Sequence, residues 1–79
     1  MHSVTIVGVV DTVSPAEIRV FAKAVNEYDC EAFSVDVSRL SAATKRCLRV
    51  GAMVAVTATI RGGSDDETRV AAVFARVIR

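Results

Sequence analysis

The segment Leu40–Arg61 constrains the fold of this 79-residue chain more than any other. Its first part, Ser41–Leu48, is a short helix candidate, because Ser41 can cap the first turn and Gly51 lies just past the end. In its second part, Met53–Arg61, apolar side chains recur with a period of two, which is typical of a strand with one face on the core. The segment therefore predicts a short helix that leads directly into a strand.

Two other segments are clear strand candidates. Ser3–Val13 has alternating side chains, and Gly8 within it indicates a bulge or a close approach of another backbone. Ala32–Ser38 alternates three apolar side chains, beginning with Phe33, with polar ones. The Gly-rich segment Gly62–Asp66 is a loop of the kind that joins the strands of a hairpin.

The secondary structure of two further segments is ambiguous in the sequence. Residues 15–28 begin with a match to a helix capping box at Ser14–Glu17, yet Ile18–Val25 also alternates like a strand. In residues 66–79 the periodicity favours a helix, and a strand is the alternative. Two strands here give an all-β chain, whereas two helices, near 15–28 and 66–79, give an α/β open-faced sandwich.

The composition indicates one small domain, residues 1–79, with a core of small side chains. Hydrophobic residues make up 52% of the chain, but most of them are Val and Ala, and there is no Trp. Such a core favours strands and buries little area per residue, so we expect a homo-oligomer. No apolar run is long enough to span a membrane and no export signal is visible. We therefore expect a cytoplasmic protein without a membrane partner, in which Cys30 and Cys47 are reduced thiols.

Charge is divided unevenly along the chain, although the net charge is only +1. Acidic residues dominate up to Val37, and basic residues dominate from Ser38 onward. The basic half can form a nucleic-acid surface, or the two halves can neutralise each other within one domain or across a dimer. Both interpretations stay open at this point.

The chain contains no residue pattern that is typical of catalysis. His2 is the sole histidine, and no nucleophile or carboxylate can be grouped with it by spacing. The carboxylates Asp65–Glu67 follow a Gly-rich stretch and are interpreted as a solvated loop tip rather than as a metal site. Cys47 has basic neighbours, but we expect it to pack inward beside Leu48. We therefore predict a protein that is not an enzyme and has no metal or cofactor.

Five strand-like segments occur in a defined order, at Val4–Val10, Phe21–Asn26, Phe33–Val37, Met53–Arg61 and Thr68–Ile78. The short helix and its Gly51 exit stand between the third and the fourth. In this order the segments resemble the bacterial single-stranded DNA-binding protein family and its relative, the primosomal replication protein. The resemblance implies an all-β OB-fold barrel of five strands, with a short helix between strands 3 and 4. It also implies a non-catalytic replication protein that binds single-stranded DNA through a basic groove and limited aromatic stacking.

The residues expected to bind nucleic acid are basic or aromatic side chains of these segments. The candidates for phosphate contacts are Arg19, Lys23, Arg39, Arg61, Arg69 and Arg76, and those for base stacking are Tyr28 and Phe33. The chain departs from the family in having few aromatic residues and an acidic first half, where the groove would lie. If Phe21 points into the barrel, the period of two also turns Lys23 inward, unless a bulge shifts the register.

The α/β alternative has a resemblance of its own. With helices at 15–28 and 66–79, the order of elements is similar to that of the phosphocarrier proteins of sugar transport. The chemistry of that family needs a His just before the first helix, but here Ser14 precedes Pro15 and the sole histidine is His2. This alternative therefore implies an interaction or assembly module that carries no phosphate.

Overall fold

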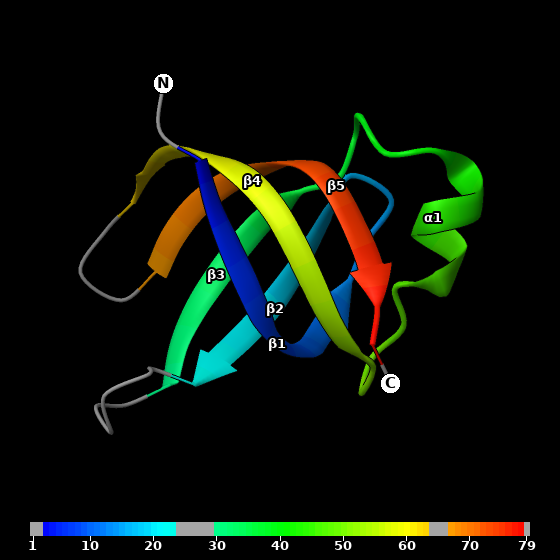
Figure 1. Ribbon diagram of the computed structural model, residues 1–79, viewed down its shortest axis with the longest axis horizontal. Coiled ribbons are helices and arrows are strands. Elements are labelled where there is room, and N and C mark those ends of the chain that lie inside the picture. Colours follow the sequence, from blue (N-terminus) through cyan, green and yellow to red (C-terminus); the bar gives the residue numbers. More distant parts are fainter. Residues whose placement is uncertain (1–2, 24–29, 64–66, 79) are drawn as a thin grey trace.

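Five strands close into a barrel in the computed structural model, which describes residues 3–23, 30–63 and 67–78 (Figure 1). In chain order the elements are β1 (Ser3–Val13), β2 (Glu17–Lys23), β3 (Cys30–Asp36), α1 (Ala42–Cys47), β4 (Met53–Gly63) and β5 (Glu67–Val77). The order around the barrel is β1-β2-β3-β5-β4, and β4 pairs with β1 to close it. The β3–β5 pairing is parallel and the others are antiparallel. This arrangement, with a short helix between β3 and β4, confirms the predicted all-β OB-fold barrel.

The described parts of residues 15–28 and 66–79 contain strands β2 and β5 and no helix, so the predicted alternative of an α/β sandwich with helices there is wrong. β2 pairs with both β1 and β3, and β5 pairs with both β3 and β4. A helix in either place would leave two neighbouring strands with open edges and unpaired backbone groups. Pairing between segments far apart in sequence therefore decides what the local pattern leaves open.

The helix-like spacing in β5 comes from a shift of register in its pairing with β4. Across this shift, successive core residues of β5 are three positions apart, at Ala72 and Ala75, instead of two. Val73 and Phe74, which lie between them, are both exposed. A strand with such an irregularity produces the i, i+3 spacing that otherwise indicates a helix.

Alternate residues of the strands fill the barrel with small apolar side chains. The core cluster consists of Ile6, Val10, Ile18, Val20, Val35, Val37, Leu40, Leu48, Val54, Val56, Ala58, Val70, Ala72 and Ala75. Within β2, Ile18 and Val20 face the core and Phe21 faces outward, as a period of two requires. The residues of β2 thus follow the strand pattern and not the helical one.

Gly8 lies where β1 passes close to the backbone of β2. A Cβ atom added at Gly8 would lie 2.8 Å from the carbonyl carbon of Phe21 and 2.9 Å from the Cα of Ala22. It would also collide with the carbonyl oxygen of Phe21. The close backbone approach predicted at this glycine is confirmed, and a side chain has no room there.

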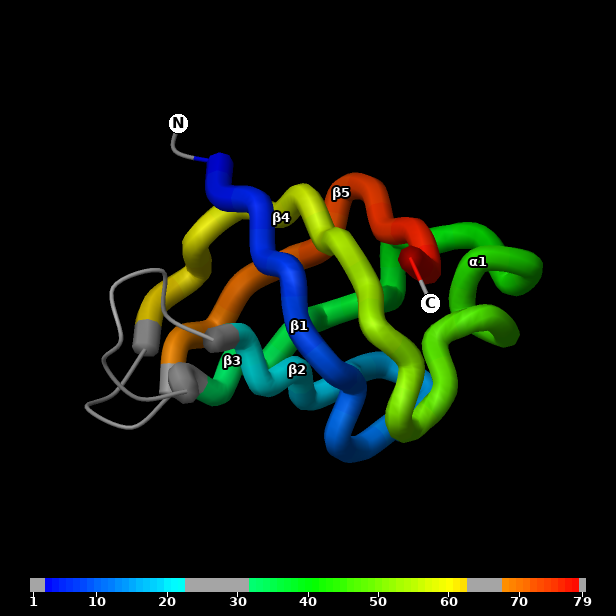
Figure 2. Tube along the Cα trace, turned by 60° about the horizontal axis from the view of Figure 1, so that its bottom comes forward, coloured from blue at the N-terminus to red at the C-terminus, as the bar shows by residue number. Residues whose placement is uncertain are grey.

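Helix α1 lies at one end of the barrel, away from the end where β2 stops and β5 starts (Figure 2). It begins at the predicted cap, because the hydroxyl oxygen of Ser41 accepts a hydrogen bond from the N–H of Thr44 at 3.2 Å. Leu48, which follows the helix, is buried, and Gly51 has a φ of 90°, in the left-handed region. Within the described ranges, no helix is long and apolar enough to cross a membrane.

Candidate nucleic-acid interface

A row of polar side chains crosses the outer face of three neighbouring strands. The pairing of β2 with β3 sets Arg19 opposite Ser34, and the pairing of β3 with β5 sets Ser34 opposite Arg69. Arg19, Ser34 and Arg69 each have a buried core residue next to them along the strand. Because successive side chains of a strand point to opposite faces, these three side chains point away from the core. Neighbouring residues across strands lie about 5 Å apart, so this row places Arg19 and Arg69 on either side of Ser34.

Arg61 joins this row from β4 at a depression in the barrel surface. The depression has a volume of about 380 Å³ and is lined by Glu17, Ser34, Asp36, Arg61, Arg69 and Val70. We call it the arginine groove. Ser34 is almost fully buried and lies on β3, between β5 and β2. β5 contributes Arg69 to the groove, and β2 contributes Glu17, which is paired with Asp36. The groove therefore combines two guanidinium groups with two carboxylates.

Asp36 remains negatively charged in this groove at neutral pH. Hydrogen bonds from the Ser38 side chain and backbone N–H lower the pKa of the Asp36 carboxyl below its ordinary value, and the charges of Arg61 and Arg39 lower it further. The backbone N–H of Ser38 donates to Oδ1 of Asp36 at 2.9 Å. An anion that enters the groove must therefore compete with Asp36 for Arg61.

The other predicted phosphate contacts lie at different places. Arg39 is exposed just after β3, close enough to Asp36 to affect its pKa. Arg76 is exposed on β5 and lines a second depression, beside α1, so the structure does not bring it to the arginine groove. Lys23 ends β2 and pairs with Cys30 through the backbone, and Tyr28 lies outside the described residues.

Phe33 faces the barrel interior and does not offer a ring to the groove. It is paired with Val20 on β2 and with Thr68 on β5, and it is partly buried against the core cluster. Its inward direction follows from the period of two that it shares with Val35 and Val37. Phe33 therefore packs against the core, and its ring is not placed to stack on a base in the groove.

Two exposed aromatic side chains were not among the predicted site residues. Phe21, 39% exposed, lies on the outer face of β2, two residues from Arg19 and opposite Ala32. Phe74, 58% exposed, lies on β5 opposite Thr57. The period of two in β2 is the signal that could have found Phe21. No sequence signal marks Phe74, because the register shift in β5 hides which face it occupies.

The predictions for Cys47, for the cluster Asp65–Glu67 and for His2 have different outcomes. Cys47 is exposed, so its predicted inward packing is wrong, and Leu48 takes the buried position. The cluster Asp65–Glu67 and the terminal His2 lie outside the residues whose side chains are described. In the remainder of the chain, no three His, Cys, Asp or Glu side chains gather in a way that could hold a metal ion.

Comparisons with protein-family models, curated proteins and solved structures give no significant match to this chain. The strand order and the short helix define the fold class, which is shared by proteins of many functions. The function is therefore argued from the chemistry of the surface.

Proposed function

We propose that the chain is a non-catalytic protein that binds single-stranded nucleic acid, preferably DNA, along the arginine groove. The observation that carries the proposal is that Arg61 and Arg69 line one depression, with Arg19 in register on the same outer face. This face spans β2 and β3, the part of OB-fold barrels that often binds oligonucleotides. The sequence resemblance to single-stranded DNA-binding and primosomal proteins supports the same role in replication.

The arginines and Phe21 supply the two interactions that single-strand binding needs. Guanidinium groups neutralise phosphates and release counterions, which makes the affinity depend on salt. The ring of Phe21, next to Arg19 on the outer face, offers a platform for one base. The carboxylates of Glu17 and Asp36 accept hydrogen bonds from base amino groups, which an unpaired strand exposes.

The outer face of β1 and β4 supports self-association of the chain. Val7, Val9 and Met53 are exposed, and Val9 is paired directly with Met53. A second copy that covers these apolar side chains would add buried area that the small core lacks. Sedimentation at concentrations from micromolar to millimolar tests this, and a monomer throughout contradicts it.

Fluorescence anisotropy of a labelled single-stranded oligonucleotide, titrated with the protein over a range of salt concentrations, tests nucleic-acid binding. Arg61→Ala and Arg69→Ala should each reduce the slope of log affinity against log salt by about 0.7 to 1. Arg49→Ala is the matched control, because Arg49 is exposed after α1 and is not among the residues that line the arginine groove. Its slope should equal that of the unmodified protein.

Phe21→Ala separates stacking from charge in the same assay. We expect the affinity to fall about 5- to 150-fold at every salt concentration, with an unchanged slope. Phe74→Ala, which removes an exposed ring on a different part of the barrel, should leave the affinity unchanged. Absence of binding at low salt, an affinity that does not vary with salt, or equal effects of Arg49→Ala and Arg61→Ala would reject the proposal.

A further inference from the structure

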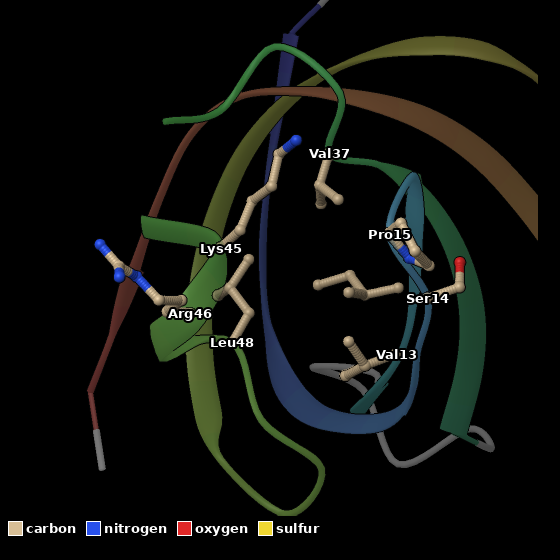
Figure 3. Close-up of a pocket in the computed structure, with 8 residues that line it drawn as sticks. Val13, Ser14, Pro15, Val37, Lys45, Arg46 and Leu48 are labelled. Carbon is tan, nitrogen blue, oxygen red and sulfur yellow. The ribbon is translucent and has the colours of Figure 1, made fainter. Parts of the chain in front are cut away.

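Another depression, distinct from the one that Arg76 lines, lies at the α1 end of the barrel. It has a volume of about 340 Å³ and is lined by Val13, Ser14, Pro15, Ile18, Val37, Lys45, Arg46 and Leu48. We call it the hairpin–helix pocket, because it separates the β1–β2 turn from α1 (Figure 3). None of these eight residues lines the arginine groove. Its size lies within the range of small-molecule sites, roughly 300–1,000 Å³.

The walls of the hairpin–helix pocket are apolar. Val13 and Pro15 stand on the hairpin side of the gap, and Leu48 stands across from them on the helix side (Figure 3). Ile18 and Val37, both members of the core cluster, complete the lining. A ligand in this space therefore makes mainly apolar contacts, which favour a hydrocarbon group over a polar one.

The hydroxyl of Ser14 and three backbone N–H groups around the pocket already have partners. The hydroxyl of Ser14 donates to the carbonyl oxygen of Glu17 at 2.9 Å and accepts from the Glu17 N–H at 3.2 Å. The backbone N–H groups of Ser14, Val37 and Leu48 donate to the carbonyl oxygens of Glu17, Ala16 and Lys45. A nucleobase would find no neutral partner among these groups for its edge, and an extended peptide would find no ladder to join.

Positive charge borders the pocket on the helix side. Lys45 and Arg46 belong to the last turn of α1, no carboxylate lines the pocket, and no ion pair joins either cation to a carboxylate in the described part of the chain. In Figure 3 the side chain of Lys45 runs along the gap towards Val37, whereas Arg46 extends away from it. Lys45 is therefore the cation placed to meet an anionic group at the mouth.

We propose that the hairpin–helix pocket binds a single-chain fatty acid of medium length. The hydrocarbon chain would lie between Val13, Pro15 and Leu48, and the carboxylate would pair with the ammonium group of Lys45. One apolar wall and one cation match a ligand with one apolar tail and one anionic head. This binding site is separate from the arginine groove and does not depend on nucleic-acid binding.

Calorimetric titration of the full chain with octanoate, decanoate and dodecanoate, each below its micelle concentration, tests the site. We expect saturable binding whose Kd tightens about fourfold for each additional buried methylene group. Decyltrimethylammonium, which has the same tail with a positive head, should bind more weakly than decanoate. Lys45→Gln should weaken decanoate binding and leave binding of decanol unchanged.

Val13→Glu places a carboxylate in the pocket and should abolish decanoate binding. Val73→Glu is the matched control, since Val73 is also an exposed strand valine, 60% exposed against 47% for Val13, and lies outside both the pocket and the outer face of β1 and β4. Equal effects of the two substitutions, tighter binding of the cationic amphiphile, or no saturation with any chain length would overturn the proposal. Binding to phosphatidylglycerol vesicles without binding of free decanoate would also overturn it, in favour of a lipid surface.

Discussion

Replacement of Gly8 by alanine tests the strand register on which the whole barrel depends. The added methyl group would lie 2.8 Å from the carbonyl carbon of Phe21 and 2.9 Å from the Cα of Ala22. Carbon atoms in contact prefer separations of about 3.5–4.0 Å, so the backbones must separate by several tenths of an ångström at least. Neither strand can move freely, because β1 is paired with β2 and β4, and β2 is paired with β1 and β3.

The cost of this substitution is expected to be a large part of the total stability. Overpacking a dense core costs about 1–3 kcal/mol, and the upper end applies here because the opposing atoms are backbone and not a flexible side chain. A chain of this length is stable by about 4–12 kcal/mol. We therefore expect Gly8→Ala to lower the free energy of unfolding by about 3 kcal/mol and the melting temperature by about 12–24 °C.

Urea denaturation followed by far-UV circular dichroism measures the change, because the chain has no Trp for fluorescence. Val7→Ala is the control: Val7 is the neighbour of Gly8 on β1, but half of its side chain is exposed on the outer face. Its effect should be much smaller, near the 0.5 kcal/mol typical of surface positions. A Gly8→Ala variant no less stable than Val7→Ala would refute the close approach of β1 to β2.

Three further predictions follow from single side chains. Val20→Ala, at a fully buried position, should lower the free energy of unfolding by about 2–3 kcal/mol in the same urea assay. Ser41→Ala removes the cap on the Thr44 N–H and should speed amide hydrogen exchange in α1, with a local cost of about 1 kcal/mol. Ser38→Ala should raise the pKa of Asp36 towards 3.8, measured by NMR titration of the side-chain carboxyl carbon. Because the pKa of Asp36 is lower in the folded state, its contribution to stability is present above pH 3.8 and is lost as the pH falls below that value. The Ser38→Ala variant should lose less stability than the unmodified protein over that acid range.

The parts of the fold that could be predicted are those with strong local signals. Ser41 caps the start of the short helix as predicted, and Gly51 has a left-handed φ in the turn after the helix, which itself ends at Cys47. The predicted bounds Ser3–Val13 are those of β1, and the expected alternation of buried and exposed side chains holds as far as Val10. Gly8 could be interpreted correctly because a glycine inside an alternating strand has few physical causes.

The Ser14–Glu17 segment shows why β2 stayed ambiguous. In a helix cap, a Ser hydroxyl accepts a hydrogen bond from the N–H three residues later, and here Ser14 makes that bond with Glu17. The Ser14 hydroxyl also donates to the Glu17 carbonyl oxygen, and the chain then continues as a strand. The local chemistry is thus the same in a turn and in a helix start, and only the pairing of β2 with β1 and β3 separates them.

The candidate site depended on registers that the sequence does not specify. Arg19 and Arg69 are 50 positions apart, and only the pairing of both with Ser34 places them in one row.

Strand pairing also determines how the acidic first half and the basic second half of the chain meet. The pairing of β3 with β5, and of β5 with β4, places Asp36 from the acidic half around one groove with Arg61 and Arg69 from the basic half. The halves therefore partly neutralise each other within the barrel, on the same surface for which we propose nucleic-acid binding. A phosphate at Arg61 must displace an existing attraction to Asp36, which predicts a salt dependence set by few net charges rather than by every arginine of the second half.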